Sequence, residues 1–340
     1  MKEDVITFSF GKNWKDYLAT INETIIAQAG TDMDDWLGRD FIEGKRVIDV
    51  GSGSGLSSLC LWRRKPRELV SFDYDIHSVE ATQTLRSREG APEAWKASQG
   101  SILDGEFVKT LGKFDIVYSW GVLHHTGEMW KAIDHAASLC APDGMFWISI
   151  YQAGSNYDGD LDLKRRYNLA DDAGKRAMIE ERIVQAKNWC KARGESEESW
   201  NKIDNRGMNN YNDIVDWLGG LPYEVAWLSE IMNFCAERGF APVRALERGQ
   251  GGCSVYLFRK MADPTACKIV GYRFETVNWS SPVFQEMKTM VEFVDRTNLN
   301  AAEAKWSQEL KKTEQAILER KRGFFRKLFR KKPRRGPDAK

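Results

Sequence analysis

Short apolar runs and stretches of helical period alternate along the first half of the chain. Runs typical of buried strands lie at residues 46–50, 68–75, 114–120 and 144–151. Stretches with apolar residues three and four positions apart lie between them, at 55–64, 76–89 and 128–140. This alternation predicts parallel βαβ units, and therefore an α/β fold with a doubly wound, Rossmann-like sheet over residues 44–151.

The pattern changes on either side of this core. Residues 1–43 are expected to form a helical cap, because apolar side chains recur at helical spacing within 12–37. Residues 223–260 add a last helix and the last strands, for an expected total of seven strands. Between the two parts of the core, residues 152–222 are first charged and helical and then aromatic. We interpret them as a lid inserted over the carboxyl edge of the sheet.

The C-terminal part has a different character again. Residues 261–298 predict an irregular extension with a helix near 284–294, and residues 299–340 predict one long amphipathic helix. Its apolar residues form a single stripe, suited to a coiled coil and hence to a homo-oligomer in its first half, over 300–318. The members of the stripe are Trp306, Leu310, Ile317, Phe324 and Leu328.

The net charge of +1 hides an asymmetry along the chain. Residues 320–335 hold ten Lys or Arg and no acid, and 336–340 sum to zero, so residues 1–319 carry 1 − 10 = −9. A basic, Phe-rich amphipathic end predicts peripheral attachment to an anionic membrane surface; a disordered, solubilising end is the alternative. The acidic body argues against nucleic acid as a partner.

Cysteine usage and hydropathy bear on the compartment. The six cysteines include no CxxC pair, which argues for reduced thiols and against a zinc cluster or a disulfide framework. No apolar run is long enough to span a bilayer, and no secretory signal is visible at the start. We expect a cytoplasmic protein, with any membrane contact on the inner face, and no bound metal.

Three glycines follow the first strand, in the stretch VIDVGSGSGLSSL (47–59). Ligands of open α/β sheets bind beyond the carboxyl ends of the strands, and glycine there allows positive φ and close approach. A P-loop would need Gly-Lys-Ser/Thr, and a dinucleotide fingerprint would need a small residue where Leu56 stands. Asp49 in the strand would repel a pyrophosphate but suit a cationic amine or sulfonium, or serve as a structural acid for the loop.

The next two turns carry further candidates. Asp73 ends the second strand in SFDYD, where a carboxylate can take both hydroxyls of a ribose, and Asp75 is interpreted as the N-cap of the following helix. The stretch GSILD follows a short predicted strand and would place Ser101 and Ile102 beside an adenine.

With SWGVLHHTG after the fourth strand, the motifs together resemble those of class I S-adenosylmethionine-dependent methyltransferases. The resemblance is greatest to small-molecule and quinone-type O-methyltransferases and covers residues 44–151 and 223–260. It implies S-adenosylmethionine as cofactor, with the glycines at its methionine part and Asp73 at its ribose. The expected cofactor residues are Asp49, Gly51, Gly53, Gly55, Asp73, Tyr74, Ser101, Ile102, Trp120 and Gly121.

His124 and His125 follow the fourth strand and are the candidates for proton transfer. An alcohol or phenol must lose a proton when it is methylated, and histidine titrates in the useful range. In the quinone-type enzymes that the chain resembles, one histidine recurs at the place of His125, so we expect His125 to be the base before His124. The alternative is a loop histidine that holds backbone or cofactor.

Acceptor recognition is expected in residues 206–226, where amides and aromatic rings occur together. Amides bind hydroxyls and rings cover apolar faces, which suits a sugar or another polyhydroxylated ring. The candidates are Asn209, Tyr211, Trp217 and Tyr223. The alternative for Trp217 and Tyr223 is that they pack the lid onto the sheet.

The sequence thus predicts methyl transfer to a hydroxyl of a small-molecule, glycan or lipid-linked acceptor at the inner membrane surface. A membrane-tethered interaction module that keeps the fold without turnover is the alternative. An NAD-dependent dehydrogenase is disfavoured by Leu56 and Asp49.

Overall fold

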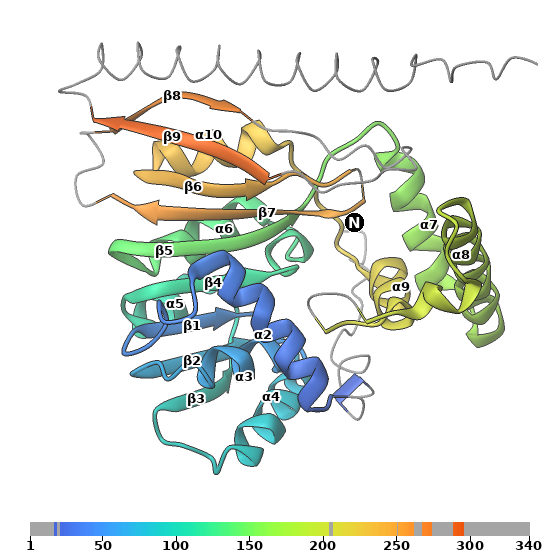
Figure 1. The fold of residues 1–340 in the computed structure, drawn as a ribbon, viewed down its shortest axis with the longest axis horizontal. Coiled ribbons are helices and arrows are strands. Elements are labelled where there is room, and N and C mark those ends of the chain that lie inside the picture. The colour runs from blue at the N-terminus through green and yellow to red at the C-terminus, as the bar shows by residue number, and fades with distance from the viewer. Residues whose placement is uncertain are drawn as a thin grey trace, which may run out of the picture.

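The fold is built on one mixed sheet, in the order β3-β2-β1-β4-β5-β7-β6-β9-β8 (Figure 1). The computed structural model describes residues 17–18, 21–203, 207–249, 251–261, 267–273 and 288–295. The seven strands from β3 to β6 confirm the predicted doubly wound, Rossmann-like sheet. The chain builds β1, β2 and β3 outward in one direction and then returns to place β4 on the other side of β1. Strand order therefore reverses between β1 and β4, where ligands of such sheets bind.

Five parallel strands form one half of the sheet. They are β1 (Arg46–Val50), β2 (Glu68–Asp73), β3 (Trp95–Gln99), β4 (Phe114–Trp120) and β5 (Cys140–Tyr151). The helices that accompany them are α2 (Glu23–Leu37), α3 (Leu56–Trp62), α4 (Ile76–Arg88), α5 (Gly105–Leu111) and α6 (Met129–Ser138). The boundaries of β1 and β4 coincide with the predicted runs, whereas α5 was not predicted.

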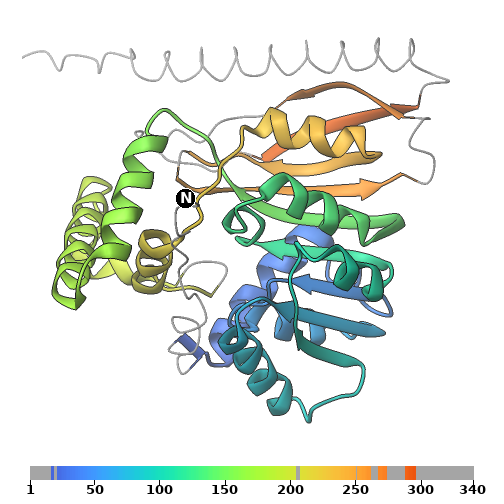
Figure 2. The same cartoon turned by 180° about the vertical axis from the view of Figure 1, so that it is seen from behind.

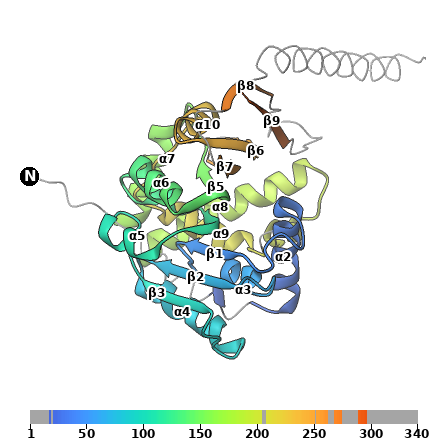
Figure 3. The same cartoon turned by 90° about the vertical axis from the view of Figure 1, so that its left-hand side faces the viewer.

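Successive residues of each strand point to opposite faces of the sheet, so each face has its own core. Val47 and Trp147 face α2, α3 and α4, and Ile48 and Phe146 face α5, α6 and α10 (Leu228–Glu237). Figures 2 and 3 show the helices divided in this way between the two faces. The runs are apolar at nearly every position because both faces of the sheet are covered.

The other half of the sheet is antiparallel. β7 (Cys253–Lys260) pairs with β5 and with β6 (Phe240–Leu246), as expected for the end of the core. The sheet then continues through β9 (Lys288–Asp295) and β8 (Cys267–Arg273). The helix predicted near 284–294 is therefore wrong over β9. The β-branched and aromatic residues of the sequence KTMVEFVD suit a strand beside β6, whereas the helical spacing of its apolar residues was the misleading signal.

Residues 152–222 leave the sheet as helices, and Figure 1 shows them gathered beyond one end of the strands. They form α7 (Tyr157–Leu169), α8 (Asp172–Ala192), the short 3-10 helix η2 (Glu197–Asn201) and α9 (Asn210–Gly219). None of the helices in the described part of the chain combines the length and apolar composition needed to cross a membrane. The predicted membrane contact at 320–335 and the oligomer stripe at 300–318 lie outside the described residues.

Candidate active site

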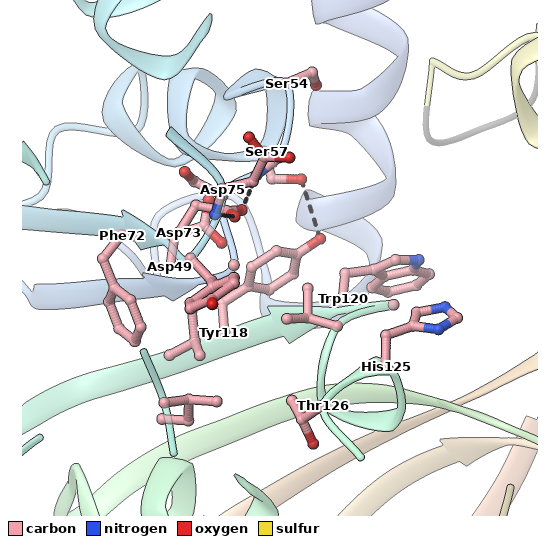
Figure 4. Close-up of a pocket in the computed structure, with 18 of the residues that line it drawn as sticks. Asp49, Ser54, Ser57, Phe72, Asp73, Asp75, Tyr118, Trp120, His125 and Thr126 are labelled. Atoms are coloured by element: carbon pink, nitrogen blue, oxygen red, sulfur yellow. Dashed lines mark hydrogen bonds between the residues drawn. The ribbon is translucent and has the colours of Figure 1, made fainter. Parts of the chain in front are cut away.

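A single cavity of about 790 Å³ opens at the carboxyl ends of β1, β2 and β4, where the strand order reverses (Figure 4). Gly51 and Gly53 line it and have φ values of +78° and +53°. A Cβ on Gly51 would lie 2.4 Å from Val122 Cγ1, on the loop after β4, so glycine lets the two turns meet. Gly55 begins α3 at φ +79° and does not line the cavity. It lets α3 approach α4, since its Cβ would lie 2.7 Å from Thr82 Cα.

Two carboxylates stand at the glycine turn. Asp73, at the end of β2, accepts the Gly53 N–H on Oδ2 and the Asp75 N–H on Oδ1, each at 2.9 Å. Burial raises its pKa to about 6, against the lowering effect of these backbone bonds. Asp49 is 1% exposed within β1, and burial raises its pKa to about 7, although Ser58 Oγ donates to it at 2.5 Å. Both carboxyl groups line the cavity, so both contribute negative charge to it when they are ionised.

The next turns complete this end of the cavity. Tyr74, Ser101 and Ile102 all line the cavity, with Tyr74 77% exposed and Ile102 buried. Ser101 and Ile102 are the two that were expected beside an adenine. Asp75 also lines it and caps α4, where its Oδ1 accepts the His77 N–H at 2.8 Å, so the predicted cap is confirmed. These contacts put the polar and apolar features of a nucleoside site on neighbouring loops.

Trp120 and Gly121 lie at the end of β4, between the two carboxylates and His125 (Figure 4). The Trp120 ring is stacked on Tyr118, with 6.2 Å between centroids, and meets Trp147 edge to face at 5.9 Å. The Tyr118 hydroxyl lies 3.3 Å from Ser57 Oγ, and burial holds its pKa well above the ordinary value. This aromatic wall is therefore fixed by packing rather than by a ligand.

The two histidines differ in their surroundings. His125 lines the cavity, and its Nδ1 lies 2.7 Å from the Pro222 carbonyl oxygen, which can only accept. Nδ1 therefore carries the hydrogen and Nε2 the lone pair. Its enclosure in the protein and the nearby Lys164 ammonium lower the pKa of His125 to about 3. His124 is fully buried, accepts the Tyr151 N–H on Nδ1 at 3.3 Å, and does not line the cavity.

The four residues proposed for acceptor binding lie away from this cavity. Asn209 caps α9 by accepting the Asn212 N–H, and Tyr211 is exposed on the same helix. Trp217 donates from Nε1 to the Gly251 carbonyl at 3.2 Å, and Tyr223 is buried. The structure does not bring these four together with Trp120 and His125.

Other residues complete the cavity beside His125 and Trp120. They come from the N-terminal helices and from the residues around α9, and are Tyr17, Asp32, Met33, Met208, Asp216, Leu221 and Pro222. Met208, Asp216, Leu221 and Pro222 belong to the segment 206–226 in which acceptor recognition was expected, although none of them was a named candidate. The other three stand in no motif. Within the described ranges, no group of three His, Cys, Asp or Glu side chains could hold a metal ion.

Known proteins resemble the same part of the chain. The family described as "Methyltransferase domain" matches residues 26–194, which include β1 to β5 and most of the cavity. The resemblance to methyltransferases that was drawn from the motifs is therefore confirmed over residues 26–194.

Curated relatives match over a shorter range. Ribosomal protein L11 methyltransferase of Pseudomonas putida (strain W619) is 31% identical over 78 residues, which are 20% of this chain and 27% of that protein. The protein of the same name from Macrococcus caseolyticus is 25% identical over 107 residues, 32% of each chain. The chain thus spans about a quarter to a third of the length of these relatives.

Solved structures are similar at low identity. Magnesium protoporphyrin IX methyltransferase from Synechocystis PCC 6803, solved with bound SAH, is 16% identical, with 71% of this chain and 88% of that chain covered and a TM-score of 0.43. A putative S-adenosyl-L-methionine-dependent methyltransferase from Methanococcus maripaludis is 15% identical, with 77% and 98% covered and a TM-score of 0.44.

Proposed function

We propose that this protein transfers a methyl group from S-adenosylmethionine to a hydroxyl of a small-molecule acceptor. The observation that carries the proposal is one continuous cavity with glycines and carboxylates at one end and His125 at the other. Both reactants could therefore meet in one enclosed space, and bringing two reactants together in the right orientation supplies much of the rate of a transfer reaction.

The residues of the cavity fit the cofactor. Gly51 and Gly53 line the cavity and present only backbone to it. Each oxygen of Asp73 accepts one backbone N–H, and a carboxylate has further lone pairs that can accept the hydroxyls of a ribose. Asp49 places a second carboxylate nearby, which favours a ligand with positive charge. The cofactor, when bound, supplies an electrophilic methyl group on a cationic sulfur.

His125 is the proposed base. The lone pair of Nε2 takes the hydroxyl proton of the acceptor as its oxygen forms the new bond to the methyl carbon. The low pKa keeps the imidazole neutral near pH 7, which is the form that accepts a proton, but it also makes His125 a weaker base than an ordinary histidine. The positive charge given up by the methyl donor reappears on the imidazole, so the net charge within the cavity does not change during the reaction.

The lining near His125 bears on the acceptor. Its members include six aromatic or apolar side chains and two carboxylates, Asp32 and Asp216. The six are Tyr17, Met33, Trp120, Met208, Leu221 and Pro222. Such a lining favours an apolar ring over a polyhydroxylated sugar among the small-molecule, glycan and lipid-linked acceptors considered from the sequence. Membrane attachment through 320–335 and self-association through 300–318 remain proposals from the sequence.

Calorimetric titration with S-adenosylhomocysteine, with NAD as the control ligand, tests the cofactor. We expect micromolar binding of the first ligand alone, and a loss on the order of 100-fold in Asp73→Ala, since hydrogen bonds to a charged group are lost. Asp104→Ala, at the exposed N-cap of α5, is the matched control. Unchanged binding by Asp73→Ala would show that the ribose site is placed wrongly.

Transfer of labelled methyl from S-adenosylmethionine into cell extract tests the chemistry. His125→Gln should bind S-adenosylhomocysteine like the parent but transfer little label, whereas His77→Gln, at an exposed histidine, should behave as the parent does. Binding without transfer in the parent, with every extract, would instead support an interaction module that keeps the fold without turnover.

A further inference from the structure

Three side chains of α7 donate hydrogen bonds to one short segment, residues 217–223. Tyr157 donates from its hydroxyl to the Tyr223 carbonyl at 3.1 Å, and Asn168 donates from Nδ2 to the Gly219 carbonyl at 2.9 Å. Lys164 donates from Nζ to the Trp217 carbonyl. Positions 157, 164 and 168 are seven and four residues apart, so they lie on one face of the helix. That face of α7 therefore fixes the course of segment 217–223.

Lys164 is the most costly of the three to place. Its side chain is fully buried, and its ammonium lies over the rings of Trp217 at 4.2 Å, Tyr223 at 4.5 Å and Tyr151 at 5.5 Å. Taking an ammonium out of water costs several kcal/mol, which ring faces and a carbonyl acceptor only partly offset. A methionine would fill similar space without that cost, so packing alone does not explain why a charged hydrogen-bond donor stands at position 164.

The charges around Lys164 act in both directions. Burial lowers the pKa of Lys164 to about 7, and the Arg182 guanidinium, which lies over the Trp217 ring at 4.3 Å, lowers it further. The Asp216 and Asp160 carboxylates and the Cys253 thiol oppose this lowering. Even with these carboxylates the pKa stays at about 7, so Lys164 is charged in only about half of the molecules at pH 7. The neutral amine also carries N–H groups, so the hydrogen bond to segment 217–223 can form in either state.

Segment 217–223 in turn determines the state of His125. Its Pro222 carbonyl accepts from Nδ1, and Gly220 packs against the ring, where an added Cβ would lie 2.7 Å from Cε1 and 3.3 Å from Nε2. The ring is thus held by a carbonyl on one edge and by backbone on the other. A shift of the segment would release both contacts, and with them the preference for hydrogen on Nδ1.

We propose that Lys164 is a positioning residue, which holds segment 217–223 so that His125 keeps its hydrogen on Nδ1 and its lone pair on Nε2. The catalytic meaning of this arrangement rests on the proposed function, whereas the arrangement itself does not. Two other titratable side chains pack against the His125 ring, His124 and Tyr151. The titratable groups that share its cavity are Asp32, Asp49, Asp73, Asp75, Glu128, Asp216, Tyr17, Tyr74 and Tyr118.

Imidazole ¹⁵N chemical shifts of the full chain report the tautomer directly, without any acceptor. The chain has four histidines, so single His→Gln variants assign every signal. In the parent, His125 should show hydrogen on Nδ1 and should not titrate between pH 5 and 8. In Lys164→Met it should show both tautomers. A raised pKa alone does not count as support, because loss of the nearby ammonium raises the pKa of His125 without any shift of the segment.

Internal and matched controls separate this effect from general loosening. His135 donates from Nδ1 to the Ile102 carbonyl at 2.7 Å, far along the chain from segment 217–223, and its signals should not change. Lys175→Met removes a lysine that lies over Tyr167 at 5.9 Å but makes no bond to the segment, and should leave His125 as in the parent. If Lys164→Met does not fold, Asn168→Ala removes a neighbouring tie and should mix the tautomers partially.

An unchanged His125 tautomer in folded Lys164→Met would overturn the proposal. Titration with S-adenosylhomocysteine on the same samples keeps this outcome distinct from a failure of the proposed function. A parent that binds no cofactor but shows the predicted tautomer, lost in Lys164→Met, would refute the function and retain the positioning role.

Discussion

Asp49→Asn should make the protein more stable above neutral pH and should reduce the dependence of its stability on pH. Asp49 is buried in β1, where burial is the largest cause of its raised pKa and the Asp73 carboxylate raises it further. The Ser58 hydroxyl opposes both effects but does not cancel them. Asparagine keeps the shape of the side chain and an acceptor for Ser58, and cannot ionise.

The pKa values give the size and the sign of the effect. In the unfolded chain Asp49 has an ordinary pKa near 3.8, and in the folded protein the pKa is about 7. Between these values the folded state binds more protons than the unfolded state, so stability is lost as pH rises and then levels off above pH 7. Each pH unit in the window is worth about 1.4 kcal/mol, so the total is about 4 kcal/mol.

Urea denaturation of both proteins from pH 5 to pH 8 measures this difference. The gap in unfolding free energy between Asp49→Asn and the parent should widen by about 3 kcal/mol over that range, because two pH units of the window remain above pH 5. Asp104→Asn is the matched control, since asparagine caps a helix as well as aspartate at the exposed start of α5. A gap that stays constant within about 1 kcal/mol would refute a titrating carboxyl at position 49.

Three further results are expected. Binding of cationic S-adenosylmethionine at pH 7 should release protons from Asp49, seen as a heat that depends on the ionisation enthalpy of the buffer; equal heats in phosphate and Tris would contradict this. Gly51→Ala should lower the melting temperature more than Gly38→Ala. Both substitutions place alanine at a positive φ, which costs roughly 1–2 kcal/mol, but only the alanine at position 51 would clash with Val122. Deleting residues 320–340 should move the protein from the pellet of anionic liposomes to the supernatant, and an unchanged pellet would exclude the basic end as the attachment.

The strands of the parallel half could be predicted from the sequence because each one is a continuous run of apolar residues. The runs at 46–50 and 114–120 coincide with β1 and β4, and the glycines between strand and helix place the turn. β6 was expected only as one of the last strands within 223–260, without bounds of its own. Pro242 interrupts its run, and the pairing with β7 shifts register between Pro242 and Arg244. A strand with such a register shift has no regular pattern of apolar residues that would reveal it in the sequence.

The residues of the cavity also fall into a group that the sequence predicted and a group that it did not. Residues that follow strands were predicted, because parallel strands bring their carboxyl ends to one edge of the sheet. Tyr17, Asp32 and Met33 could not be predicted from local pattern, because they reach the cavity through the packing of helices that no motif marks. Lys164 is one of several basic residues in DLKRRYN, and only the fold shows that it is the buried one.

The aromatic residues of 206–226 show why composition predicts chemistry better than it predicts the ligand. Rings that cover a sugar can equally cover a cation, and here Trp217 and Tyr223 cover the ammonium of Lys164 from the same chain. Their effect on the proposed reaction would then pass through Pro222 and His125. Substitutions at Trp217 should therefore change the rate of transfer for every acceptor, whereas substitutions at Met33 or Met208, which line the cavity, should change which acceptor is used.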